Sequence, residues 1–291
     1  MYHYIRNFDK KYPYYNKLSV NQFISQIKKF QKYGIVNNSK ELFIPSNKII
    51  LTFDDGVKDH LNAAEILKKN DAIGIFFIPT KPYLDNKILD VHKTHLLTGR
   101  VKGDEILEKL KKYLIKNNIK NFFDMTEKKK FKEVYKKDND NENKKEFKKI
   151  MNYYGNLNMK EKILNFLLKT FDINFETKNF YLTKKEIKYI SSLGMLIGSH
   201  GESHTLLSRM KIGKQKKEIE NSKKYLTNIV KSKIEFFCYP YGGKKSYNSH
   251  TLNILKKLKF KQAYSVKNKD ISKNDLLKKN LELPRYDCNL F

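Results

Sequence analysis

The chain has few residues that could stabilise it covalently. Its 291 residues include two cysteines, Cys238 and Cys288, which are far apart and form no Cys-x-x-Cys pair. This spacing is neither that of a structural zinc site nor that of the disulfide framework of small secreted proteins. We therefore interpret both cysteines as free thiols in a reducing compartment.

Long apolar runs are also missing. No segment contains the roughly 18 uninterrupted apolar residues that a membrane-spanning helix needs. The first eleven residues are polar and aromatic, without the apolar centre of a secretory signal. These two absences predict a protein that stays in the cytoplasm.

Arginine is scarce, although the chain is strongly basic. The formal net charge is +29, yet only four of the 60 basic residues are Arg. A surface selected for nucleic acids would use Arg for bidentate contacts with phosphates and bases, whereas abundant Lys and Asn are typical of an AT-rich coding sequence. We expect no specific nucleic-acid partner, and leave open a weak attraction to anionic membrane surfaces or phosphorylated substrates.

The first candidate site follows a short apolar stretch. Residues 49–56 read Ile-Ile-Leu-Thr-Phe-Asp-Asp-Gly, so a predicted buried strand ends on Asp54 and Asp55. In parallel α/β proteins the catalytic residues gather at the carboxyl ends of such strands. Because two adjacent carboxylates repel each other, a bound cation is the simplest partner for them. A turn or helix cap is the alternative interpretation.

A second apolar segment, residues 195–197, precedes a pair of histidines. His200 and His204 are four residues apart, so they would share one face if the chain turns helical here. Two His and one carboxylate, with coordination left open to water, are typical of a catalytic metal site. Gly201 stands directly after the first His, where a thermolysin-like site has Glu.

These motifs resemble those of the polysaccharide deacetylases, the NodB-homology or carbohydrate esterase family 4. Residues 52–56 match the family's first motif, and residues 200–204 match its His-x-x-x-His motif. Residues 237–242 resemble the third motif, but Cys238 stands where the family has Arg. The pair Tyr2-His3 is similar to the start of a branch with permuted motifs, which acts on exported or surface polysaccharides.

The resemblance implies removal of an acetyl or formyl group from an amino sugar in glycan biosynthesis. One divalent ion, with zinc as the first expectation, would be held by Asp55, His200 and His204. The ion would activate water and polarise the carbonyl group. Asp54 would be the general base of this reaction.

The resemblance also implies a donor for the oxyanion of the reaction. This donor would be the main-chain N–H of Tyr241, the first amide after Pro240. A plain tight turn is the alternative. Arg285, on the last predicted strand, could orient Asp54 by a bidentate contact in place of the missing motif Arg, or lie at the surface.

The acid that protonates the leaving amine is the remaining role. The family's usual acid is a late His, and no His follows His250. The permuted branch implies His3 instead. The other candidates are His60, His92, His95 and His250, and of these His92 and His95 are the favoured alternatives, because they follow a short apolar run and could line the cleft.

Strands and helices alternate along most of the chain, which predicts an α/β fold with a parallel sheet. The resemblance implies an irregular (β/α) barrel of the NodB type, in one domain over residues 1–291. Residues 98–180 interrupt the alternation as a Lys-rich helical insertion, either a lid or docking subdomain or a spacer without function. We expect strands at 2–5, 74–78, 195–199, 234–239, 262–266 and 281–285, helices at 19–34, 59–69, 183–194, 214–230 and 249–258, and a loop or frayed helix at 136–149.

Three classes of function are therefore compatible with the sequence. The first is the metal-dependent carbohydrate N-deacetylase, whose partner is an N-acetylated sugar or glycan. The second keeps the fold and the metal but hydrolyses a non-carbohydrate amide or imide. The third is a basic binding protein with a dead catalytic site, recognisable by steeply salt-dependent binding. The sequence predicts neither the sugar nor the oligomeric state.

Overall fold

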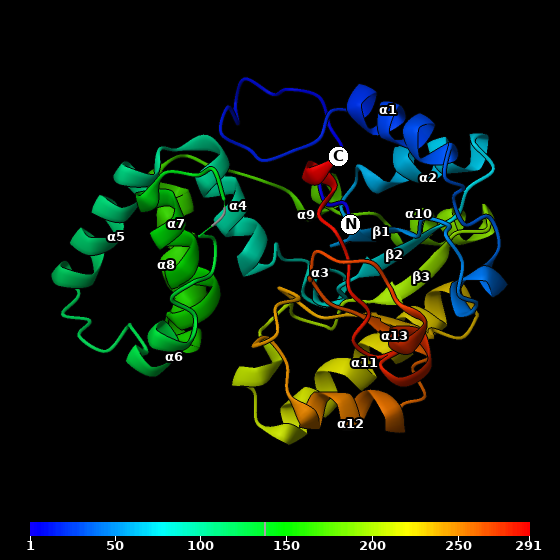
Figure 1. Cartoon of the computed structure of the whole chain (residues 1–291). Helices are drawn as coiled ribbons and strands as arrows, with labels where there is room; N and C mark the ends of the chain where they lie inside the picture. The colour runs from blue at the N-terminus through cyan, green and yellow to red at the C-terminus, as the bar shows by residue number, and fades with distance from the viewer. Residues whose placement is uncertain (137) are drawn as a thin grey trace. The chain divides into compact units, whose positions relative to one another are not determined.

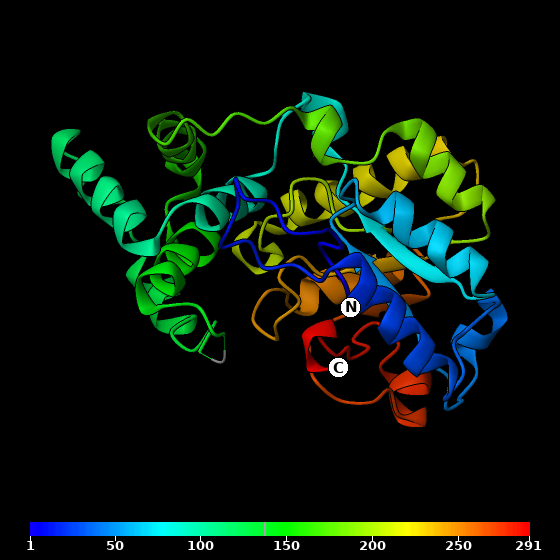
Figure 2. The ribbon, with the colours of Figure 1, turned by 90° about the horizontal axis from the view of Figure 1, so that it is seen from above.

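The computed structural model describes residues 1–136 and 138–291, and its contacts divide the chain into two units (Figure 1). The first unit contains Met1–Asn7, Lys17–Lys87 and Thr177–Phe291. The second contains Phe8–Asn16 and Ile88–Glu176. In the first unit both ends of the chain lie side by side (Figure 1, Figure 2), because the amide of Cys288 donates to the carbonyl of Met1.

The first unit is built on a sheet of five parallel strands in chain order. Because all strands are parallel, their carboxyl ends meet at one edge of the sheet, where the sequence motifs lie. The predicted strands at 2–5 and 281–285 are reduced to single bridges, Tyr2 with Phe53 and Leu283 with Tyr264. The first of them ends early because Ile5 already pairs with Leu18. The strands are β1 (Leu51–Asp54), β2 (Gly74–Ile78), β3 (Leu196–Ser199), β4 (Phe236–Cys238) and β5 (Gln262–Tyr264).

Both faces of the sheet are buried, so its strands are apolar throughout rather than alternating. Phe76 and Ile78 of β2 pack into the larger hydrophobic cluster, which includes the apolar faces of the surrounding helices. Ile75 and Phe77 point to the other face, into a smaller cluster that includes Tyr264. The sheet thus forms a curled half-barrel with helices around it.

The long helices of the first unit begin where the sequence predicted. Ser19 and Thr183 close capping boxes with Gln22 and Glu186, so each satisfies orphan amides at a helix start. The predicted strand at 74–78 is also confirmed. The helices of this unit are α1 (Val20–Gln31), α2 (His60–Lys69), α3 (Lys81–Asp85), α9 (Thr177–Phe180), α10 (Lys184–Ser192), α11 (Ile212–Val230), α12 (Ser249–Lys257) and α13 (Lys273–Lys278), with short 3-10 turns η1 (Ser39–Phe43), η3 (Leu207–Arg209) and η4 (Cys288–Leu290).

The second unit is helical. One prediction for it is wrong in part: within the tract 136–149, residues 142–149 form a regular helix. Asn141 caps that helix by accepting from the amide of Lys144, and Phe147 anchors it in the core, while Lys137 of the same tract lies outside the described residues. The helices are α4 (Asp90–Arg100), α5 (Gly103–Lys116), α6 (Met125–Lys130), α7 (Glu142–Lys149), the π-helix η2 (Ile150–Tyr154) and α8 (Leu157–Thr170).

None of the helices formed by residues 1–136 and 138–291 is long and apolar enough to cross a bilayer.

Candidate active site

Three side chains from distant parts of the first unit converge beyond the carboxyl ends of β1 and β3. The Oδ1 atom of Asp55 lies 3.5 Å from Nε2 of His200 and 3.3 Å from Nε2 of His204. All three residues are buried, and one ligand atom of each lies within 4.8 Å of the others. The predicted metal ligands are therefore brought together.

The loop that carries the two histidines differs from the prediction. Residues 200–206 form an irregular loop and not a helical turn, so the i and i+4 spacing does not explain why both rings meet. Gly201 and His204 instead adopt left-handed backbone conformations, with φ of 75° and 56°. Asp55, the third predicted ligand, has φ of 83°. Such conformations cost free energy in residues with side chains and cluster at functional sites.

The geometry of this cluster fits a divalent ion. Zinc bonds of about 2.0–2.2 Å to nitrogen and oxygen place the ligand atoms of a tetrahedral site about 3.4 Å apart. The distances from Oδ1 of Asp55 to Nε2 of His200 and of His204, 3.5 and 3.3 Å, are close to this value. Nδ1 of His200 lies 2.8 Å from the carbonyl oxygen of Cys238, so Nδ1 carries the proton and Nε2 keeps its lone pair. Burial and the neighbouring His204 lower the pKa of His200 to about 4. The ring is therefore neutral, as a metal ligand must be.

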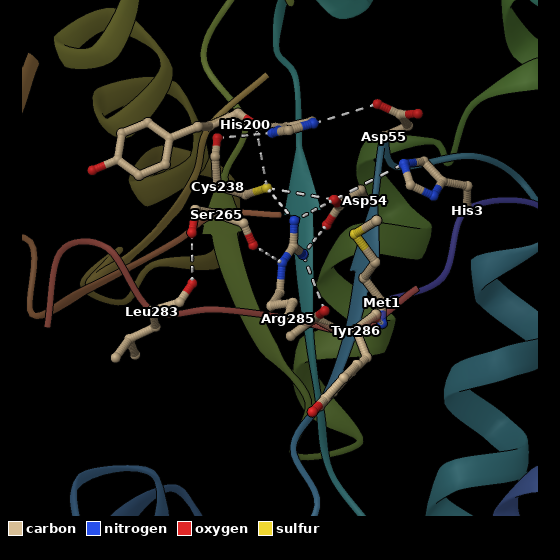
Figure 3. Close-up of polar contacts among 12 residues, drawn as sticks. Met1, His3, Asp54, Asp55, His200, Cys238, Ser265, Leu283, Arg285 and Tyr286 are labelled. Atoms are coloured by element: carbon tan, nitrogen blue, oxygen red, sulfur yellow. Dashed lines mark hydrogen bonds and ion pairs between the residues drawn. The ribbon is translucent and has the colours of Figure 1, made fainter. Parts of the chain in front are cut away.

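Asp54 is held by Arg285 (Figure 3). Nη1 of Arg285 donates to Oδ1 of Asp54 and Nη2 donates to Oδ2, both at 2.8 Å. Nη1 also donates to Oγ1 of Thr52, and Nε donates to the carbonyl of Ser265, so the guanidinium is fixed in its plane. Burial raises the pKa of Asp54, but the charge and hydrogen bonds of Arg285 outweigh it and hold that pKa well below its usual range. The carboxylate is therefore ionised.

Cys238 lies beside this pair, in the position that the motif gives to Arg. Its Sγ accepts from Nη2 of Arg285 at 3.0 Å and donates to Asp54 at 3.4 Å. Burial raises the pKa of Cys238, so the thiol is protonated. Asp54, His200 and Cys238 are close enough to bind an ion, but the Arg285 cation next to them disfavours a second one. The set with Asp55 is the better metal site.

His3 reaches the same site from the N-terminal segment. Its Nε2 lies 4.0 Å from Oδ2 of Asp54, and its side chain is 36% exposed (Figure 3). Residues at the start of α2 hold this segment in place. Nε2 of His60 lies 2.8 Å from the carbonyl oxygen of His3, and the carboxylate of Asp59 accepts from the amide of Ile5. His3 thus presents an ionisable ring to solvent beside Asp54.

Tyr241 borders the ligands on another side. Its ring packs edge-on against His204, with ring centres 4.9 Å apart. The turn that holds it has φ of 64° at Tyr241 and 60° at Gly242. A Cβ on Gly242 would lie 2.3 Å from Cγ2 of Val266, so the tight turn requires glycine at this position. The turn places Tyr241 next to His204, a predicted metal ligand.

A protein-family model described as polysaccharide deacetylase matches residues 44–263. The match covers most of the chain and includes all three motifs. The chain belongs to the polysaccharide deacetylase family. A search of the curated proteins finds no significant match.

Solved structures share the fold of this deacetylase family member. The deacetylase PplD of Streptococcus pyogenes, solved with acetate, is 19% identical, with a TM-score of 0.59 over 98% of this chain and 88% of that one. A de-N-acetylase from Aggregatibacter actinomycetemcomitans is 13% identical, with a TM-score of 0.55 over 98% and 91%. IcaB from Ammonifex degensii is 14% identical, with a TM-score of 0.51 over 91% and 81%. The curled sheet is therefore a NodB-type (β/α) barrel.

Two of the histidines predicted as alternative acids belong to the second unit. His92 is buried on α4 in the second unit, with its ring 5.7 Å from that of His95. A part for either in the reaction stays a prediction, and Asp54, Asp55 and the other predicted site residues all lie in the first unit.

Two further residues support the site: Glu218 was not predicted from the sequence, and His60 was considered only as a candidate acid. His60 contacts the carbonyl of His3, and Glu218 accepts hydrogen bonds from the loop between the two histidine ligands. The signal for Glu218 is weak: it is a charged residue on the same helical face as the apolar Ile219 and Leu226. His60 gives no signal beyond following the first motif closely.

Proposed function

We propose that this chain is a metal-dependent hydrolase that removes N-acetyl, or N-formyl, groups from an amino sugar in a surface polysaccharide or glycan. The observation that carries the proposal is the convergence of Asp55, His200 and His204 beside an ionised Asp54. Family membership supports the carbohydrate substrate class. Zinc is the first choice of ion, because two imidazoles and one carboxylate are typical zinc ligands.

Both the metal site and the general base, Asp54, contribute to the activation of water. When bound by Asp55, His200 and His204, the ion supplies Lewis acidity, which activates water and polarises the acetyl carbonyl group. Asp54 lies next to this site and takes the proton of the attacking water. Its fork with Arg285 fixes the direction in which its oxygens point. General base catalysis of this kind contributes about 10²- to 10⁴-fold in rate.

The other two groups act on the tetrahedral intermediate. The main-chain N–H of Tyr241 donates to the oxyanion, an interaction whose loss costs about 10²- to 10³-fold. His3 gives a proton to the nitrogen as the carbon–nitrogen bond breaks, so that the product leaves as a neutral amine. The partial exposure of His3 suits this role, because the sugar must approach from the solvent.

The experiment is acetate release from an N-acetylglucosamine oligomer, measured for the wild type and for Asp54→Asn. We expect turnover that a chelator abolishes and added zinc restores, and a variant that keeps its metal but loses at least about 100-fold in rate. Asp270→Asn is the matched control, because this carboxylate is exposed. Full turnover by Asp54→Asn would refute the base assignment. Turnover of cyclic imides or ureides with none of the sugar would refute the substrate class.

A further inference from the structure

Helix α11 carries polar side chains on a buried face. Gln215, Glu218 and Ser222 are spaced three and four residues apart, so they lie on one side of the helix, and none is more than 8% exposed. Buried charges are rare in proteins unless they are paired or hydrogen-bonded. Glu218 therefore needs partners on the element that faces it.

Those partners belong to the loop between the two histidine ligands. The Oε1 atom of Glu218 accepts from the amide of Glu202 at 2.9 Å and from Oγ of Ser203 at 2.8 Å, and it also accepts from the amide of Ser203. A single carboxylate oxygen thus binds two consecutive amides and one hydroxyl. These residues directly precede His204 in the chain.

The same helix also supports the beginning of the loop. Oγ of Ser222 lies 2.8 Å from Oγ of Ser199, which accepts from the amide of Gly201 at 3.2 Å. His200 stands between Ser199 and Gly201 in the chain. Helix α11 therefore fixes the backbone next to both histidine ligands.

The loop also contacts the segment after β2, where the amides of Thr80 and Lys81 donate to the carbonyls of Gly201 and Glu202, but its own amides at 202 and 203 donate to Glu218. Residues 200–206 have no helical or strand pattern, and Gly201 and His204 have positive φ. A Cβ on Gly201 would lie 3.3 Å from Oε1 of Glu218, so the carboxylate follows the backbone closely. Without this acceptor two partly buried amides would lose their partner, at the free-energy cost of unsatisfied donors. Burial raises the pKa of Glu218, and the hydrogen bonds from Ser203 and Glu202 oppose this rise only in part.

We propose that Glu218 is a positioning residue for the metal site, which holds the loop at 200–204 in ligand geometry before the ion arrives. The inference rests on the proposed function, because it takes His200 and His204 to be metal ligands. A loop that is already ordered loses less conformational entropy when the ion binds. The metal affinity therefore depends on a carboxylate that does not touch the metal.

The test is the dissociation constant for zinc, measured by chelator competition on the metal-free full chain. Glu218→Ala and Glu218→Asp, which remove or withdraw the acceptor oxygen, are expected to bind zinc about 10- to 100-fold more weakly. Glu218→Gln, which keeps an oxygen at the same reach, is expected to restore most of this affinity. The proposal would be overturned if the zinc dissociation constants of Glu218→Ala and Glu218→Asp were both within about twofold of the wild-type value.

Two controls separate positioning from general stability. Glu220→Gln changes the same side chain type on the same helix, at a partly exposed position paired with Lys224, and should leave zinc affinity unchanged. Leu226→Ala should lower the melting temperature but not the zinc affinity, because it opens a cavity two turns further along α11. A fall in affinity for Leu226→Ala equal to that for Glu218→Ala would also overturn the proposal.

The design distinguishes this proposal from the proposed function. If the wild type binds no zinc, the metal site itself fails. If the wild type binds zinc and the Glu218 variants bind it equally well, only the positioning role fails. Should Glu218→Ala not fold, the comparison of Glu218→Asp with Glu218→Gln decides, and equal affinities of these two would overturn the role of the acceptor oxygen.

Discussion

Replacing Arg285 by Met would test how Asp54, the proposed general base, is held. The guanidinium makes two hydrogen bonds of 2.8 Å to Asp54, which is 3% exposed. Met fills a similar volume without charge, so the carboxylate would remain buried without its cation. Removing one partner of a buried ion pair costs about 3–5 kcal/mol. We expect the free energy of unfolding to fall by this amount.

The same variant should lose activity for a related reason. Without Arg285, burial raises the pKa of Asp54, so a larger fraction of the carboxyl group is protonated and cannot accept the proton of water. Arg285→Lys keeps the charge but cannot form the fork, so we expect an intermediate loss of both stability and turnover. Urea unfolding followed by circular dichroism gives the free energy, and acetate release gives the rate.

A double-mutant cycle isolates the interaction itself. In Asp54→Asn the buried charge is absent, so the further change Arg285→Met should cost less than it does in the wild type. We expect a coupling free energy of about 2 kcal/mol or more between the two positions. Additive effects of the two substitutions, or a loss below about 1 kcal/mol for Arg285→Met alone, would refute the reasoning.

Three further predictions concern the groups around the ligands. His3→Gln should lower amide hydrolysis by about 10²- to 10⁴-fold but spare p-nitrophenyl acetate, whose leaving group needs no proton; equal losses on both substrates would contradict the acid role. Tyr241→Phe should keep turnover within about threefold, because the proposed donor is the main-chain amide. Gly242→Ala should lower the free energy of unfolding by about 1–3 kcal/mol, because of its positive φ and the contact with Val266, and an unchanged urea midpoint would contradict this.

The sequence predicted that Asp55, His200 and His204 would meet, because its motifs end on parallel strands, whose carboxyl ends lie at one edge of the sheet. The choice of Asp55 rather than Asp54 as a metal ligand came from the resemblance to the family and stays a prediction. Arg285 could be suspected because Arg is rare in a chain that otherwise uses Lys. The fork with Asp54 then needed the structure, since the two residues are 231 positions apart.

The conformation of the histidine loop could not be predicted from its own residues. The spacing of His200 and His204 suits a helical turn, but the loop amides donate to Glu218 and to Ser199 rather than to carbonyls four residues back. This conformation depends on how α11 packs against the loop, which local sequence does not encode. The length of the predicted strand at 2–5 also depends on contacts that local sequence does not encode. Tyr2 pairs with Phe53 and Ile5 pairs with Leu18, so each pairing is limited to one bridge.

The most direct test of the account is the zinc content of purified protein after chelator treatment and reloading. Elemental analysis would compare the wild type with Asp55→Ala, His200→Ala and His204→Ala. The account predicts about one zinc per wild-type chain and a large loss of tightly bound zinc in every variant. A wild type that retains no zinc, or variants that retain as much as the wild type, would contradict it.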